Sequence, residues 1–299
     1  NQGFRSILKL LPARSLDQGM DYVNGIVNTN LSSRMGAGAV RSFNQASTLH
    51  QMPVSLIGVA ISTAFFPKLT EELGSGNKKE FYQTFRQALR TIIWIALPVA
   101  IVAFFGRGYV TSFISNIGNN DSNGTIASVL GTLCVAIFAR SIFHIASRGF
   151  YAFQDTKTPF YVSILAISLT IGLSVWFYMM SWGVDGLGLA QSIGAVIEII
   201  ILLGILQKRA HGELLNKAFC RAAGRMLFAG LIAGCVAFSM TKFVPLMATD
   251  TSLVITIPKF LLIAGVSFVA YLVASYFLDL KEAKPVFKYF KKILFRNVK

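Results

Sequence analysis

Apolar stretches of about 20 residues recur along the whole chain and constrain its fold more than any other feature. One such stretch crosses the hydrocarbon core of a bilayer as a single α-helix. Only 14% of the 299 residues are charged, which is too few to cover so many apolar runs in water. The sequence therefore predicts an all-α polytopic membrane protein. Eight spans are expected, at residues 15–33, 44–66, 88–106, 125–148, 159–180, 186–207, 219–241 and 256–278.

The net charge of +15 is distributed as in a membrane protein rather than a nucleic-acid binder. Basic residues lie between the apolar runs and in the C-terminal tail, not on one face of a soluble fold. With the N-terminus in the cytoplasm, 22 of the 28 Lys and Arg residues fall on the cytoplasmic side and 5 on the outer side, with Arg140 inside a span. The bias predicts that both ends of the chain are cytoplasmic and that nucleic acid is not a partner.

Residue patterns typical of enzymes and metal sites are missing from the sequence. Cys134, Cys220 and Cys235 lie in or beside apolar runs without CxxC spacing, and no His, Cys and carboxylate cluster has metal-ligand spacing. We therefore expect no catalysis, no metal and no cofactor. The first residue is Asn1 and no secretory leader follows it, so the chain resembles the later part of a longer protein.

Polar residues recur at helical spacing in the first two spans, where hydrocarbon makes them costly. Each stripe falls on one side of its helix. They either join helices by hydrogen bonds or line a watery cavity, and the two carboxylates of the first stripe favour the cavity. His50, nearly opposite Thr48 around its helix, is expected at the membrane interface. The stripes consist of Asp17, Asp21, Asn24 and Asn28 in the first span and Asn44, Thr48, Gln51, Ser55 and Ser62 in the second.

A basic stripe of Arg140, His144 and Arg148 descends the fourth span toward its cytoplasmic end. Arg148 can extend to the interface, but Arg140 lies about two turns deeper and needs a carboxylate, a carbonyl or an anionic ligand. Glu198 in the sixth span, with Gln191 on the same face, is a candidate partner. A structural ion pair and a role in binding a substrate or an ion remain alternatives.

The segment "FYAFQDTKTPF" at 150–160 is a polar interruption between two long apolar runs. It predicts a cytoplasmic turn, with Thr158 as the helix N-cap and Pro159 at the first helical position. Asp155 can accept hydrogen bonds from nearby backbone amides. Pro53, inside the second span, is expected to kink that helix.

Two segments resemble the MurJ/MviN lipid II flippases, which belong to the multidrug/oligosaccharidyl-lipid/polysaccharide exporter superfamily. They are "NTNLSSRMGAGAVRSFNQASTLHQMPVSLIGVAISTAFFPKLTEEL" (28–73) and "RGFYAFQDTKTPF" (148–160), in the order and spacing of that family. The resemblance implies that the eight spans correspond to helices 7–14 of a fourteen-helix flippase. Its signature residues here are Pro53, Gly58, Pro67, Asp155, Thr156, Lys157, Thr158 and Pro159.

The resemblance also implies a function and a division of the chain. Lipid II would move from the cytoplasmic to the outer leaflet of the bacterial cytoplasmic membrane by alternating access, between this part of the protein and an N-terminal lobe. Residues 1–208 would form the second six-helix lobe, 209–280 two helices with a groove for the lipid tail, and 281–299 a basic cytoplasmic tail. The tail is expected to lie as a helix on anionic headgroups.

The family's functional positions carry over incompletely. His144, Arg148 and Asn28 match polar family positions, whereas Thr48 stands where many members have an arginine. The departure gives weight to a flippase for another polyprenyl-diphosphate glycan. Two further alternatives are a cation-coupled antiporter, in which Asp17 and Asp21 would bind the ion, and a non-transporting scaffold, because one lobe alone cannot alternate access. Candidate ion-coupling residues are Asp17, Asp21 and Glu198. Candidate cavity residues are Arg140, His144, Arg148, Thr48, Asn44, Gln51, Asn24 and Asn28.

Overall fold

A computed structural model describes residues 22–115, 123–246 and 253–294. Every regular element in these ranges is helical, and a helix also covers residues 22–33. The elements are α2 (Ala39–Val54), the π-helical η1 (Ser55–Val59), α3 (Ala60–Gly74), α4 (Lys78–Phe105), α5 (Arg107–Ser115), α6 (Asn123–Ala152), α7 (Lys157–Met179), α8 (Gly183–Arg209), α9 (Lys217–Phe243), α10 (Leu253–Phe277) and α11 (Ala283–Leu294).

Seven helices of the described ranges are long and apolar enough to cross a membrane, with α2, η1 and α3 counted as one. They confirm the predicted all-α membrane fold. The predicted span at 15–33 overlaps the helix at 22–33, but its first turns lie outside the described residues. The helices also run past the apolar windows: α4 begins at Lys78, where Asn77 accepts a hydrogen bond from the Glu80 amide. An N-cap of this kind sets a helix end that hydrophobicity alone does not reveal.

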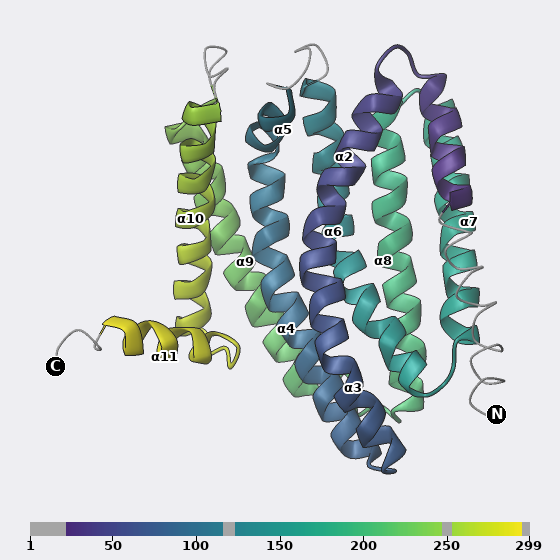
Figure 1. The fold of residues 1–299 in the computed structure, drawn as a ribbon, viewed down its shortest axis with the longest axis vertical. Helices are drawn as coiled ribbons and strands as arrows, with labels where there is room; N and C mark the ends of the chain where they lie inside the picture. Colours follow the sequence, from purple (N-terminus) through teal and green to yellow (C-terminus); the bar gives the residue numbers. More distant parts are fainter. Residues whose placement is uncertain (1–21, 116–122, 247–252, 295–299) are drawn as a thin grey trace.

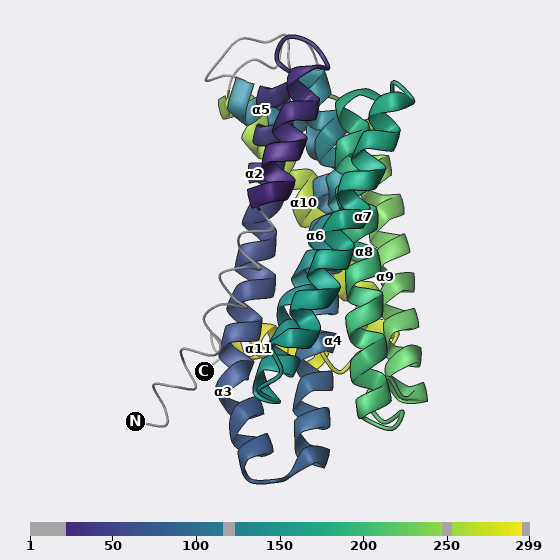
Figure 2. The same cartoon turned by 90° about the vertical axis from the view of Figure 1, so that its right-hand side faces the viewer.

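Helix α6 lies at the centre of the bundle, against α8, α2 and α4 (Figure 1). Helix α7 covers α8 on one side, while α9 and α10 pack against each other on the other side. Figure 2 shows α2 and α3 on the opposite side of the bundle from α8 and α9. The largest apolar core joins α4, α6, α8 and α9, with fully buried Phe85, Leu89, Ile145 and Leu202 among its residues.

The second span is one helix of 36 residues with an internal irregularity. Pro53 lies inside α2, and the π-helical turn η1 begins two residues later. Proline cannot donate the backbone hydrogen bond of a regular helix, so a local adjustment of this kind is expected. The structure thus shows a π-helical turn directly after Pro53, while the kink itself stays a prediction.

The turn between α6 and α7 differs from the prediction in its cap. Helix α7 begins at Lys157, so Thr158 is not the N-cap and Pro159 is the third helical residue. The Asp155 carboxylate instead accepts hydrogen bonds from the Thr158 amide (3.0 Å) and hydroxyl (2.7 Å). The first four amides of a helix have no internal partner, so the missing N–H of Pro159 still costs nothing. Thr158 is therefore the donor to the cap, not the cap itself.

Asp155 also pairs with Arg209 at the end of α8, so this turn ties three helices together. Partial burial favours a higher pKa for Asp155, but the hydrogen bonds from Thr158 and the charge of Arg209 outweigh it and lower the pKa below its usual value. The ionised Asp155 carboxylate therefore stabilises the folded state at pH values above its unfolded-state pKa near 4. This stabilisation is lost as the pH falls through the lower folded-state pKa.

Replacing Asp155 by alanine is expected to lower the thermal unfolding temperature, since a lost helix cap costs about 1 kcal/mol. The measurement is thermal unfolding of purified protein at pH 7 and again below pH 4. The difference in thermal unfolding temperature between wild type and variant should be smaller at the lower pH. An equal gap at both pH values would contradict the role of the ionised carboxylate.

Candidate substrate cavity

A cavity of about 1490 Å³ lies between the helix at 22–33, α2 with η1, and α6. The polar stripe of the second span lines it from Asn44 to Ser55, and Gln191 of α8 closes one side. Apolar side chains such as Phe43 and Phe143 complete the wall. Six of the eight predicted cavity residues therefore meet here: Asn24, Asn44, Thr48, Gln51, Arg140 and His144.

Asn28 is buried between helices and does not belong to this lining. The Asn28 side-chain nitrogen donates to the Asn24 side-chain oxygen (3.0 Å), and the Ser174 hydroxyl of α7 donates to the Asn28 side-chain oxygen (3.3 Å). At this position the polar stripe joins helices, which was the other reading of the pattern. The remaining residues of that stripe, Asp17 and Asp21, lie outside the described residues.

Arg148 likewise contacts neighbouring helices rather than the cavity. Its guanidinium donates to the Ser62 hydroxyl (2.9 Å) and the Thr63 hydroxyl (2.7 Å) of α3, and it lies 5.4 Å from the centre of the Phe66 ring. Ser62, predicted to continue the cavity stripe, is buried by this contact. Arg148 therefore fastens α6 to α3 close to the turn between α6 and α7.

Arg140 is the formally charged side chain of the described cavity lining. Among the described lining residues it is the only Lys, Arg, Asp or Glu. Its guanidinium lies 3.7 Å from the Glu198 carboxylate, and its side chain is 27% exposed whereas that of Glu198 is 4% exposed. The other Glu198 oxygen accepts a hydrogen bond from the Ser163 hydroxyl of α7 at 2.7 Å. The predicted pairing is confirmed, and the buried carboxylate holds an arginine that faces the cavity.

His144 lines the cavity one turn below Arg140, next to a close helix crossing. A Cβ atom on Gly58 would lie 2.8 Å from the Ser141 Cα atom and 2.9 Å from the His144 ring. The glycine of η1 therefore allows the second span to approach α6 closely enough for both to line one cavity. This contact gives the signature residue Gly58 a physical role.

The prediction for His50 was wrong. It is buried and lines the cavity, with Nδ1 2.7 Å from the Ser47 carbonyl oxygen. Because a carbonyl oxygen only accepts, the proton of that bond belongs to Nδ1. Helix α2 packs against α6. The part of the α2 surface that lines the cavity is therefore wider than the polar stripe alone. Thr29, Asn30 and Ser33 were also missed, although they lie on the same polar helix.

Comparison with known proteins identifies the group to which this bundle belongs. The sequence model of the family described as "Lipid II flippase MurJ" matches residues 1–275, which is most of the chain. The chain belongs to the MurJ family. The match extends over the helices of the cavity and over α9, and it ends within α10.

Individual MurJ relatives match over part of their length. The lipid II flippase MurJ of Burkholderia cenocepacia is 31% identical over 207 residues, which cover 69% of this chain and 40% of the relative. The probable lipid II flippase MurJ of Borreliella burgdorferi is 30% identical over 181 residues, covering 60% of this chain and 36% of the relative. The chain thus spans less than half the length of these MurJ relatives.

Two solved structures share the fold. The structure titled "Lipid II flippase MurJ, inward closed conformation" superposes with a TM-score of 0.71 at 20% identity, covering 99% of this chain and 56% of that one. An outward-facing MATE-family transporter of the MOP superfamily gives a TM-score of 0.61 at 13% identity, over 97% of this chain and 69% of that one. The MurJ-family bundle is therefore also the bundle of a MATE transporter, and the fold alone does not decide what it carries.

Proposed function

We propose that this chain is the second lobe of a flippase that moves lipid II from the cytoplasmic to the outer leaflet of the bacterial cytoplasmic membrane. The observation that carries the proposal is Arg140, the one full charge in the described cavity lining, with amides and hydroxyls around it. The diphosphate of lipid II is anionic, and its sugars present hydroxyl and amide groups. A guanidinium binds phosphate through charge-assisted hydrogen bonds, while Asn, Gln and Thr side chains suit the sugars.

The lobe needs a partner to give alternating access. We expect an N-terminal lobe of the same protein to face the cavity, residues 1–208 to form the second lobe, 209–280 to add the helices for the polyprenyl tail, and 281–299 to be the cytoplasmic tail. The bias of Lys and Arg supports an orientation with both ends of this chain in the cytoplasm.

Each predicted residue has a proposed part in this function. Asn24, Asn44, Thr48, Gln51 and His144 would contact the headgroup beside Arg140. Contact between the substrate and Arg148 or Asn28 stays a prediction, because both side chains join helices in this conformation. Ion coupling by Asp17, Asp21 or Glu198 also stays a prediction.

A flippase for another polyprenyl-diphosphate glycan is the second candidate, and Thr48 favours it. An arginine is common at this family position, and threonine offers no charge for a phosphate. A cation-coupled antiporter is less well supported, because the formally charged side chain in the described lining is positive and would not bind a cation. A scaffold without transport leaves the polar cavity without a use.

Complementation of cells whose own lipid II flippase can be switched off tests the proposal. The chain would be supplied alone and behind its N-terminal lobe, with membrane insertion checked for both. We expect the two-lobe protein to restore growth and the single lobe to fail, because one lobe cannot alternate access. Failure of a well-inserted two-lobe protein would favour the second candidate. Adding Thr48→Arg to that protein would then ask whether the missing arginine is the reason.

A further inference from the structure

The α10–α11 corner is a fixed part of the bundle rather than a loose tail. Leu280 in the turn and Ala283 at the start of α11 are fully buried, and Val286 and Phe287 pack against the main core. The Phe287 ring lies 4.8 Å from that of Tyr276 at the end of α10. The corner therefore has a defined position relative to the membrane-spanning helices.

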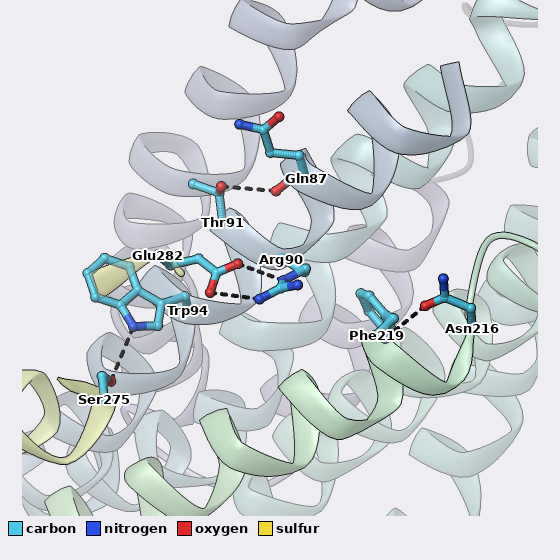
Figure 3. A network of polar contacts seen from close by, with 8 residues as sticks. All are labelled: Gln87, Arg90, Thr91, Trp94, Asn216, Phe219, Ser275 and Glu282. Carbon is cyan, nitrogen blue, oxygen red and sulfur yellow. Dashed lines mark hydrogen bonds and ion pairs between the residues drawn. The ribbon is translucent and has the colours of Figure 1, made fainter. Parts of the chain in front are cut away.

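Polar contacts fasten the same corner to α4 (Figure 3). Both carboxylate oxygens of Glu282 face the Arg90 guanidinium, at 2.6 and 3.0 Å. One turn along α4, the Trp94 indole N–H donates to the Ser275 hydroxyl of α10 at 3.2 Å. A two-oxygen pairing of this kind fixes orientation as well as distance. Glu282 is thus directed inward, to the transport lobe.

Helix α11 runs across the end of α10 rather than continuing it (Figures 1 and 2). Helix α10 is long and apolar enough to cross the membrane, so its end marks the membrane surface. Tyr276 and Phe277 in its last turn are exposed, as expected of aromatic side chains at the border of hydrocarbon and headgroups. The placement puts α11 at the depth of the lipid headgroups.

The outward side of the corner is basic. Lys281, Lys284 and Lys288 are exposed, and residues 281–299 contain seven Lys and Arg but one acidic residue, the inward-paired Glu282. Lys284 also pairs with Asp279 of the turn at 2.7 Å, which lowers the pKa of Asp279 and leaves the surface positive overall. Lys284 and Lys288 are four residues apart, the spacing of neighbours on one helix face, and the sequence adds Lys291 and Lys292 one turn further on.

We propose that the α10–α11 corner is a docking surface for anionic phospholipid headgroups of the leaflet on its own side, phosphatidylglycerol being a suitable probe. A helix lying in the interface with basic residues on one face and apolar residues on the other binds such headgroups by charge and burial together. The Arg90–Glu282 pair and the Trp94–Ser275 hydrogen bond connect this lipid-binding surface to α4. The inference stands independently of the substrate of the cavity.

The test measures how fast individual lysines react with a small neutral acetylating reagent. The purified chain is placed in nanodiscs of phosphatidylcholine alone or of phosphatidylcholine with phosphatidylglycerol, and acetylation is read by peptide mass spectrometry. We expect phosphatidylglycerol to slow acetylation of Lys284 and Lys288 several-fold. Lys78 and Lys79 are internal controls, since they are exposed near the α3–α4 connection, which extends beyond the level of α11 (Figure 2).

A matched pair of variants separates the corner from total charge. Lys291→Gln with Lys292→Gln should weaken the protection of Lys284 and Lys288, whereas Lys208→Gln with Lys217→Gln, an equal change of charge at exposed positions elsewhere, should not. Equal reactivity of Lys284 and Lys288 in both nanodiscs would overturn the proposal and leave the surface open to a soluble acidic partner. Equal slowing at Lys78 and Lys79, or equal effects of the two variants, would overturn it as well.

Discussion

Replacing Arg140 by glutamine is expected to abolish growth support by the two-lobe protein in the complementation assay. The change removes the full charge from the described cavity lining. It also leaves the Glu198 carboxylate, buried and 3.7 Å from the lost guanidinium, without that partner. Breaking a buried pair from one side costs about 3–5 kcal/mol, so the single variant alone does not separate lost binding from lost stability.

The double variant Arg140→Gln with Glu198→Gln separates the two effects. It removes both charges together, so protein abundance in the membrane should recover, while growth support should stay absent because the anion contact is gone. Abundance is measured by immunoblot beside growth. A double variant that restores both would show that Arg140 is only half of a structural ion pair. Arg148→Gln is the matched control and should cost less, since its contacts are to Ser62 and Thr63 outside the cavity.

Replacing Gly58 by alanine is expected to destabilise the protein and to lower transport, although the change adds one methyl group. The new Cβ atom would lie 2.8 Å from the Ser141 Cα atom, and backbone cannot move aside as a flexible side chain can. Overpacking of this kind costs about 1–3 kcal/mol. The thermal unfolding temperature of purified protein should fall by several degrees.

Gly204→Ala provides the control of opposite sign. Gly204 lies in α8 with nothing within 4 Å of an added Cβ atom. Alanine within a helix is favoured over glycine by about 0.5–1 kcal/mol, so this variant should unfold at the same temperature or slightly higher. If both variants behave alike, the close crossing of η1 and α6 does not limit stability.

The sequence predicted the spans well because hydrocarbon requires long apolar helices, and apolar length is visible in a single sequence. It predicted the cavity face of α2 for the same reason, since polar residues in a span need polar surroundings. It could not predict which polar residues find a partner on another helix. Asn28 with Ser174 and Arg148 with Ser62 are far apart in the sequence, and only packing brings them together.

Other differences arise where the backbone departs from a regular pattern. Angles counted along a uniform helix place Ser62 with Thr48, and they do not anticipate the π-helical turn between them. Short helices were also missed, because α5 is neither long nor strongly apolar. The cap by Asp155 was anticipated only as a local bond, since a polar turn contains several residues able to cap.

The π-helical turn divides the second span into two halves with different tasks. Before η1, Asn44, Thr48 and Gln51 line the cavity, whereas Ser62 after it accepts a hydrogen bond from Arg148 of α6. The half after η1 is held against α6 by Arg148, which donates to the Ser62 and Thr63 hydroxyls. A change in the angle between the two halves at η1 would therefore move the α2 part of the cavity lining relative to this attachment.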